Sequence, residues 1–421
     1  MHYRGIDMRR YCDIFLGEMR RGLEGKPSSL EMIPTYIEAG HALPSGQRVI
    51  ALDAGGTNLR VAVVSFEASG KPLVEDLSRY RMPGSDGEIG KEEFFRALAG
   101  FVKPVAGRAE RIGFCFSYAA EIMPDKDGRL IYFSKEVRAR GVEGEMIGRN
   151  LSLAMKNAGA REPARIVLLN DTVATLLAGR NSTPGRRFDG FVGFVCGTGL
   201  NTAYVESNAE IKKKPELDPV GSQIINTESG SFSRGPAGVI DEEFAATTIA
   251  PEKYRNEKMI SGAYLGSLCL FAVRRAARDG CLSPEAGREL ARLEALSTKD
   301  LNDFLYSPES DAHPLGRLCA RIPSADGRAL YALMDALVER AALLAAINLC
   351  AVLLKSGRGR DPRFPVCITV DGTTFWQLKG FRVRVECYMR SFLVGDRTRC
   401  FEIARAQDAP LIGAAIAGLT N

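Results

Sequence analysis

Two glycine-rich turns, each placed between apolar runs, hold the residue types best suited to binding an anion. The first lies in LDAGGTNLRV at 52–61, and the second lies in VCGTGLNTAYVE at 195–206. Glycine lets the backbone turn sharply and leaves N–H groups open to a ligand, so such a turn can hold a phosphate. Thr57 and Thr198 add hydroxyl donors, and Asn58 adds an amide. A tight hairpin without a ligand would explain one such turn, but it does not explain two.

Both turns differ from the two best-known phosphate loops. A Walker loop reads GxxxxGK[ST] and a dinucleotide fingerprint reads GxGxxG, and each is followed by a helix. Here an apolar strand follows the glycines, so we expect a β-hairpin whose turn carries the phosphate donors. Arg60, in the strand after the first turn, can add charge to the phosphate site. Asp53, beside that turn, can hold a Mg²⁺ ion through water, because Mg²⁺ loses its water reluctantly.

The pair Asn170-Asp171 directly follows the apolar run RIVLL at 165–169, which predicts a buried strand. Polar residues beyond the carboxyl end of such a strand lie where α/β sheets bind ligands. A helix N-cap is the structural alternative, and it would need only one of the two residues. We therefore interpret the pair as functional.

Five further polar residues are candidates for the same site, although each alone is more often a surface or capping residue. They are Ser117, Lys135, Asn201, Glu228 and Glu257. Neutral and acidic hydrogen-bonding groups that converge on one cleft would suit a polyhydroxylated ligand such as a sugar.

The composition is typical of a soluble globular protein with more than one domain. The chain has 421 residues, of which 45% are hydrophobic and 25% charged, and its net charge of +5 is spread along the chain. The run Lys212-Lys213-Lys214 is interpreted as a solvated loop, so nucleic acid is not an expected partner. Only three histidines are present and none lies in a motif, which argues against histidine base catalysis and a His-rich metal site.

Cysteine usage and the apolar segments indicate a cytoplasmic protein. The ten cysteines form no CxxC pair, and several, such as Cys115 and Cys196, stand in apolar runs. This pattern is typical of free thiols in a reducing compartment. The N-terminus has no apolar signal-peptide core. The longest apolar stretch, 341–354, is shorter than the ~20 residues of a membrane span, so we expect a buried core helix there and no membrane.

Strands and helices alternate along the chain, which predicts an α/β fold. Helices are expected at 7–24, through most of the chain after 240, and at 411–419. Strands are expected on both sides of each glycine turn, and in 111–122, at the start of 165–179 and in 365–375. Because the glycine-turn unit occurs once in each half, we expect two related domains that face each other.

The chain resembles the hexokinases, within the superfamily that includes actin and the large heat-shock chaperones. Residues 52–61 match the family's first phosphate segment, LDLGGTNFRV. Similar segments follow in family order over nearly the whole chain: MIPTYIEA (32–39), GFCFSYAAE (113–121), YFSKEVRARGVEGEMIG (132–148), LLNDTVATLLAG (168–179), VCGTGLNTAYVE (195–206), INTESGSF (225–232), EKMISGAYLG (257–266) and VDGTTF (370–375).

The resemblance implies two ribonuclease H-like α/β domains with the actin-like ATPase fold, which flank a cleft and carry added helices. We expect an N-terminal helical segment at 1–45 that packs on the large domain. A small domain is expected at 46–170 plus 406–421, and a large domain at 171–405.

The resemblance also implies ATP-dependent phosphorylation of a hexose at its 6-hydroxyl, with glucose as the first expectation. Asp171 would be the general base, and Lys135 would lie near the migrating phosphoryl group. The hexose would be held by Ser117, Ser134, Lys135, Asn170, Asp171, Asn201, Glu228 and Glu257. ATP and its Mg²⁺ would be held by Asp53, Gly55, Gly56, Thr57, Asn58, Arg60, Gly197, Thr198, Gly199, Gly372 and Thr373. Hexose and ATP are the expected partners of a monomer or homodimer.

Several departures from the family pattern concern the expected ligands. The family's Ser-Phe-Pro is Ser117-Tyr118-Ala119 here, and its Thr-Lys is Ser134-Lys135. The tryptophan that follows the family's glutamate is missing after Glu228. The second nucleotide loop, Gly-Ser-Gly-Lys-Gly-Ala-Ala, is replaced by APLIGAA at 409–415, which removes a hydroxyl and a lysine near the nucleotide.

Three other functions are compatible with parts of this pattern. The protein could phosphorylate mannose, fructose or an amino sugar. It could be a sugar sensor with a weakened nucleotide loop. A chaperone-like or actin-like ATPase would have no reason to carry the Asn-Asp-Thr segment together with two matching glutamates.

Overall fold

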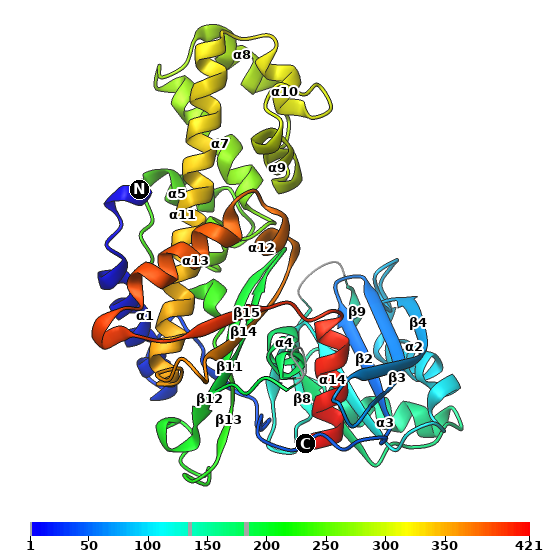
Figure 1. The fold of residues 1–421 in the computed structure, drawn as a ribbon. Helices are drawn as coiled ribbons and strands as arrows, with labels where there is room; N and C mark the ends of the chain where they lie inside the picture. The colour runs from blue at the N-terminus through cyan, green and yellow to red at the C-terminus, as the bar shows by residue number, and fades with distance from the viewer. Residues whose placement is uncertain (1, 134–136, 181–184) are drawn as a thin grey trace.

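The computed structural model describes residues 2–133, 137–180 and 185–421. They form two lobes, each built on a mixed β-sheet with helices packed on both faces (Figure 1). The α/β class expected from the sequence is confirmed.

The sheet of the small lobe has the strand order β10-β6-β2-β3-β4. Residues of β2 alternate between two cores, because successive side chains of a strand point to opposite faces. Ile50 and Leu52 join the core with helices α2 (Lys91–Val102) and α3 (Ile147–Asn157). Val49 and Ala51 join the core with helices α4 (Asp171–Gly179) and α14 (Ala409–Thr420). The strands are β2 (Val49–Gly55), β3 (Asn58–Phe66), β4 (Pro72–Arg81), β6 (Arg111–Phe116) and β10 (Arg165–Leu169).

The sheet of the large lobe has the order β1-β13-β12-β11-β14-β15. Without the edge strand β1 and taken from the other end, as β15-β14-β11-β12-β13, this sheet repeats the sheet of the small lobe. In each sheet the first three strands are parallel, and the last two run antiparallel to their neighbours. The glycine turns join β2 to β3 and β11 to β12, so each lobe contains one. The strands are β1 (Ile33–Pro34), β11 (Gly190–Cys196), β12 (Leu200–Ser207), β13 (Ser222–Asn226), β14 (Val366–Asp371) and β15 (Phe401–Ala404).

Two helices, α4 (Asp171–Gly179) and α14 (Ala409–Thr420), lie between the two sheets (Figure 1). They pack on each other, and α14 also packs on β6 and β2, while α4 packs on β11. The backbones approach so closely that a Cβ atom on Gly413 would lie 2.0 Å from the carbonyl oxygen of Ala174. Both helices therefore couple the small sheet to the large one.

The run 111–122 differs from the single strand expected from its apolar character. The chain leaves the sheet after Phe116, and Ala119–Ile122 forms β7, which pairs with β8 (Gly128–Tyr132) in a separate hairpin. The break places Ser117 at the end of β6. The small lobe is completed by β5 (Ile89–Gly90), β9 (Ala139–Arg140), α2 (Lys91–Val102) and α3 (Ile147–Asn157).

Helices form most of the large lobe after residue 238, as expected, and Figure 1 shows that several of them project beyond the sheet. The N-terminal helix α1 packs on the longest of them, α11. The helices are α1 (Met8–Leu23), α5 (Val239–Ala246), α6 (Arg255–Ile260), α7 (Leu265–Arg278), α8 (Pro284–Arg292), α9 (Thr298–Tyr306), α10 (Pro314–Cys319), α11 (Ser324–Ser356), α12 (Thr373–Gln377) and α13 (Phe381–Phe392).

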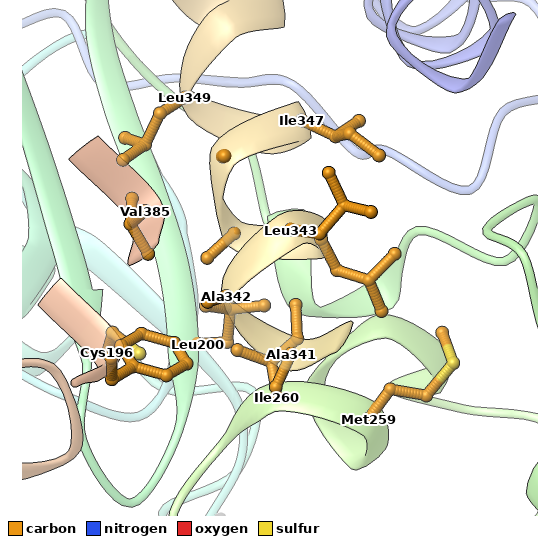
Figure 2. Close-up of a cluster of buried hydrophobic side chains, with 14 of the residues drawn as sticks. Cys196, Leu200, Met259, Ile260, Ala341, Ala342, Leu343, Ile347, Leu349 and Val385 are labelled. Atoms are coloured by element: carbon orange, nitrogen blue, oxygen red, sulfur yellow. The ribbon is translucent and has the colours of Figure 1, made fainter. Parts of the chain in front are cut away.

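Within the described residues, α11 is the one helix long and apolar enough to cross a membrane by length and composition. Most of its apolar stretch is nevertheless buried inside the protein, and a core helix passes the same test. Figure 2 shows Leu343, Ile347 and Leu349 of α11 in a cluster that includes Cys196 and Val385. The apolar stretch at 341–354 is thus the core helix that the sequence predicted.

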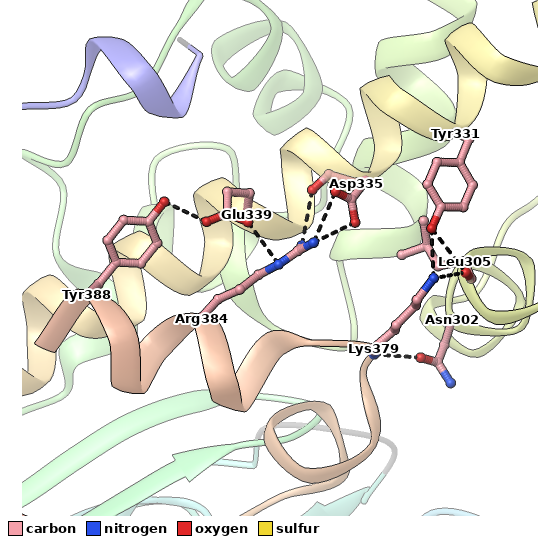
Figure 3. Close-up of polar contacts among 8 residues, drawn as sticks. All are labelled: Asn302, Leu305, Tyr331, Asp335, Glu339, Lys379, Arg384 and Tyr388. Atoms are coloured by element: carbon pink, nitrogen blue, oxygen red, sulfur yellow. Dashed lines mark hydrogen bonds and ion pairs between the residues drawn. The ribbon is translucent and has the colours of Figure 1, made fainter. Parts of the chain in front are cut away.

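A row of polar contacts holds α13 on α11 (Figure 3). Arg384 Nη2 donates to Asp335 Oδ1 at 2.8 Å, and its Nε lies 2.8 Å from Glu339 Oε2. The Tyr388 hydroxyl donates to Glu339 Oε1 at 2.6 Å. These contacts fix the segment that follows β14 on the large lobe.

Candidate active site

The first glycine turn is a β-hairpin, as predicted, in which Gly55 pairs with Asn58. The Tyr118 hydroxyl donates to the carbonyl oxygen of Gly56 at 2.5 Å. A Cβ on Gly55 would lie 3.9 Å from Ser117 Oγ, so the end of β6 is adjacent to the turn. The hydroxyl of Tyr118 therefore fixes the turn against the segment that carries Ser117.

The guanidinium group of Arg60, on the second strand of this hairpin, contacts two carboxylates. Its Nε donates to Asp53 Oδ2 at 2.8 Å, and its Nη2 lies 2.7 Å from the same oxygen. Its Nη1 forms an ion pair with Asp408, the N-cap residue of α14. All three guanidinium nitrogens are thus engaged, and a phosphate would have to share one of them.

The second turn, between β11 and β12, consists of Gly197, Thr198 and Gly199. A Cβ on Gly197 would lie 3.1 Å from Cα of Gly372, so the turn touches the loop after β14. Gly372 has a φ of +118°, which L side chains rarely adopt, and a Cβ there would lie 2.3 Å from the carbonyl oxygen of Cys196. Glycine is required where these two loops meet.

The polar side chains of both turns and of the loop after β14 are accessible to a ligand. Thr57 is half-buried, whereas Asn58, Thr198 and Thr373 are exposed. Thr373 is the first residue of α12. Hydroxyl and amide donors are therefore available on both lobes.

Asn170 and Asp171 have different local roles. Asn170 is the N-cap of α4, and its side chain accepts a hydrogen bond from Thr172 N at 2.8 Å. Asp171 is the first residue of the helix, where its carboxylate accepts from Thr172 Oγ1 at 3.2 Å. The cap alternative thus explains Asn170 and leaves the Asp171 carboxylate without a capping role.

A buried network holds Glu228 in the large lobe. Asn226 Nδ2 donates to Glu228 Oε1 at 2.8 Å, and Asn201 Nδ2 donates to the same oxygen at 3.2 Å and to Asn226 Oδ1 at 2.8 Å. Nearby, Glu257 Oε2 accepts from Leu200 N at 2.8 Å, at the end of the second turn. Asn201, Glu228 and Glu257 therefore converge at the start of β12.

Carboxyl groups from both lobes lie within electrostatic range of one another. Burial raises the pKa of Asp53, and the Asp171 carboxylate adds to the increase, while Arg60 opposes it. Burial likewise raises the pKa of Asp371, again with a contribution from Asp171. Burial raises the pKa of Glu228 to about 7, and Asp171 contributes there also. The Asp171 carboxylate is thus within electrostatic range of Asp53 beside the first turn, of Asp371 at the end of β14 and of Glu228.

Comparison with known proteins decides the family. Two family models, both described as hexokinase, match residues 1–181 and 191–420. Hexokinase-5 of Oryza sativa subsp. japonica is 30% identical over 97% of this chain and 85% of its own length.

The chain belongs to the hexokinase family.

Further relatives agree with this assignment. Hexokinase-1 of Schizosaccharomyces pombe is 27% identical over 97% of the chain and 86% of its own length. The structure of the Schistosoma mansoni hexokinase, determined with glucose, superposes with a TM-score of 0.78 at 26% identity and covers 98% of this chain and 96% of that one. The protein described here is therefore a sugar kinase, a phosphotransferase with the actin-like ATPase fold.

Two of the predicted site residues of this hexokinase, Ser134 and Lys135, lie outside the described residues. The segment 409–415, which the resemblance leads us to expect as an altered nucleotide loop, is described and forms the first turns of α14. Asp408 precedes it in the left-handed conformation, with a φ of 50°, and Pro410 lies in the first turn. A helix thus begins where the family has its Gly-Ser-Gly-Lys sequence.

Tyr118, Asn226 and Asp408 contact the residues of this hexokinase site but were not among the predicted ones. Asn226 lies two residues before Glu228 on the same predicted segment, which was a usable signal. Asp408 carried no such signal, because it is placed by a contact with a distant part of the chain.

Proposed function

We propose that this hexokinase transfers the γ-phosphoryl group of ATP to the 6-hydroxyl of a hexose, with glucose as the leading substrate. The observation that carries the proposal is the position of Asp171, whose carboxylate lies within electrostatic range of Asp53 beside the first turn and of Glu228 in the polar network. A base in that position is within electrostatic range of residues that we assign to the phosphate site and to the sugar site.

Asp171 acts as the general base in this proposal. It accepts the proton of the 6-hydroxyl while the bond between that oxygen and the γ-phosphorus forms and the bond to the β-phosphate oxygen breaks, which releases ADP. The start of α4 suits this role, because the N-terminal end of a helix stabilises a carboxylate.

The hexose is held by hydrogen bonds from both lobes. Ser117 and Asn170 supply neutral groups beside the first turn and at the N-cap of α4, and Asn201, Glu228 and Glu257 supply the network at the start of β12. A carboxyl with a pKa of about 7, as at Glu228, can accept or donate a hydrogen bond to a sugar hydroxyl. Ser134 and Lys135 keep their predicted roles in sugar binding and charge stabilisation.

The nucleotide is held by the two glycine turns and the loop after β14. The backbone N–H groups of the turns, together with Thr57, Asn58 and Thr198, bind the phosphates. Gly372 and Thr373 lie near the adenosine. Because Arg60 is engaged by two carboxylates, we assign it mainly to holding the hairpin, with a phosphate contact only if Asp408 releases it.

Mg²⁺ fits this site as part of the ATP complex. Among the described residues, no group of three histidine, cysteine or carboxylate side chains is placed to hold a metal ion. Arg60 engages Asp53 Oδ2, and Asp53 Oδ1 lies on the side of the first turn, 3.9 Å from a Cβ position on Gly55. This suits an ion carried by the phosphates and reached from Asp53 through water. When bound, it would neutralise phosphate charge.

A coupled assay for ADP formation tests the proposal. ATP and Mg²⁺ are supplied with glucose, mannose, fructose or glucosamine, and one reaction receives no sugar. We expect ADP formation to require a sugar, with glucose giving the highest kcat/KM. Sugar binding by calorimetry without ADP formation would instead indicate a sensor, and sugar-independent ADP formation would indicate an ATPase.

A further inference from the structure

Tyr132 and Tyr254 join the two lobes through their hydroxyl groups, whose oxygens lie 2.6 Å apart. Tyr132 is the last residue of β8, whose Leu130 belongs to the core of the small lobe. Tyr254 directly precedes α6, whose Met259 belongs to the core of the large lobe. The contact is reinforced by Lys253, whose Nζ lies 5.8 Å from the centroid of the Tyr132 ring.

The backbone at Tyr254 is held in an unfavourable conformation. Its φ of 55° and ψ of 39° lie in the left-handed region, which is disfavoured for a residue with a large side chain. The same residue begins α6, because its carbonyl oxygen accepts from Lys258 N at 3.0 Å. Strain of this kind persists only where surrounding contacts impose it, and it concentrates at functional sites.

Glu257 lies in the first turn of the helix that Tyr254 begins. Burial raises the pKa of the Tyr254 hydroxyl, the bond to Tyr132 adds to the increase, and the carboxylates of Glu228 and Glu257 contribute further. The hydroxyl of Tyr254 is therefore within electrostatic range of both glutamates. The contact between the lobes is made beside the polar network.

We propose that Tyr132 and Tyr254 are positioning residues of the phosphotransfer reaction. Their bond holds β8 against the start of α6 and so fixes Glu257 beside the hexose. The inference rests on the proposed function. Only protein in which the two lobes are joined binds hexose well. Losing the bond reduces the fraction of protein in that state, and the apparent affinity for hexose falls in proportion to that fraction.

Three variants test the proposal: Tyr132→Phe, Tyr254→Phe and the double variant. Each single change removes one oxygen, and we expect a rise of about fivefold in the KM for hexose, the factor that corresponds to one hydrogen bond. We expect kcat and the KM for ATP to change by less than about twofold. The double variant should match either single variant, because both singles remove the same bond. Effects that multiply in the double variant would overturn the proposal.

Tyr388→Phe is the matched control, because it removes a hydroxyl bond of the same length, 2.6 Å, to Glu339 on α11. It should leave the hexose KM unchanged, and an equal rise there would contradict the proposal.

A second measurement does not depend on enzyme activity. Amide hydrogen exchange across Arg255–Ile260 should be faster in Tyr132→Phe, although residue 132 lies in the other lobe, and unchanged in Tyr388→Phe. Unchanged exchange in Tyr132→Phe would overturn the inference. If the wild-type protein shows no sugar-dependent ADP formation, the proposed function fails, whereas the exchange measurement still reports on the contact.

Discussion

Arg60 and Asp408, which lie 348 residues apart in the sequence, form an ion pair that joins the strand after the first glycine turn to the start of α14. The same guanidinium binds Asp53 through two nitrogens. The Asp408 side chain is 43% exposed, whereas that of Asp53 is 12% exposed. Loss of Arg60 should therefore cost more stability at the buried Asp53 carboxylate than at the partly exposed Asp408 carboxylate.

Arg60→Met should destabilise the protein far more than Asp408→Asn. The first change leaves the Asp53 carboxylate buried without its partner, which costs about 3 kcal/mol. The second removes a partly exposed pair, which costs about 1 kcal/mol or less. Urea denaturation of both variants measures the difference in free energy of unfolding. Equal losses would mean that the interior pair with Asp53 is not the dominant contact.

Asp171→Ala should fold and bind hexose but lose most of its turnover. A positioned base contributes about 10²- to 10⁴-fold in rate, so kcat should fall by that factor. Calorimetry with hexose and a thermal melt provide the controls for binding and folding. Asp171→Asn, which keeps the size of the side chain, should be as inactive. A kcat close to that of the wild type in either variant would remove Asp171 as the base.

Glu228 should make stability depend on pH. Its pKa in the folded protein is about 7, raised by burial above its ordinary value of 4.5. Between these two values the folded state binds a proton that the unfolded state does not, so the stabilisation present below pH 4.5 is lost as pH rises through 7. The difference in stability between wild type and Glu228→Gln, measured by denaturation at pH 4.5 to 8, should follow this course. A difference that is constant over that range would contradict the assignment.

Tyr118→Phe should weaken ATP binding more than hexose binding. The change removes the hydroxyl that donates to the Gly56 carbonyl and leaves the ring in place. We expect the KM for ATP to rise by about fivefold, the value of one hydrogen bond, and the hexose dissociation constant to stay within about twofold. A parallel loss of both affinities would show that the hydroxyl supports the fold generally. Tyr388→Phe again serves as the control.

Gly413→Ala and Gly17→Ala should have opposite effects. A Cβ on Gly413 would lie 2.0 Å from the Ala174 carbonyl oxygen, a backbone atom of the neighbouring helix, whereas a Cβ on Gly17 meets nothing within 4 Å. Overpacking at the first position should cost about 1–3 kcal/mol or more. Alanine at the second should stabilise α1 by up to about 1 kcal/mol. Thermal melts of the two variants compare them directly, and stabilisation by Gly413→Ala would show that α4 and α14 can separate.

Local patterns predicted much of this structure. The apolar runs on both sides of each glycine turn were enough to predict both hairpins, and the small-residue segment at 411–419 predicted most of α14. Both signals are local, because alternation and helical spacing are properties of neighbouring residues. The break of the run 111–122 at Ser117 was missed, since apolar residues continue on both sides of it.

Contacts between distant residues could not be predicted in this way. The pairs Arg60–Asp408 and Tyr132–Tyr254 depend on how the lobes pack, and no spacing in the sequence encodes them. The hydroxyl of Tyr118 was visible as a departure from the family pattern, but its acceptor was not. The roles of Ser134 and Lys135 stay predictions.

The position of α14 in the chain has a consequence for synthesis. Apart from α1 and β1, the elements of the large lobe leave the ribosome after the strands of the small lobe, and α14, which packs on β2 and β6, comes last of all. Until α14 emerges, the apolar face formed by Val49, Ala51 and Val64 lacks this covering helix and is open to solvent or to a chaperone. The sheet of the small lobe is thus synthesised before that of the large lobe is complete, but it is covered only at the end of translation.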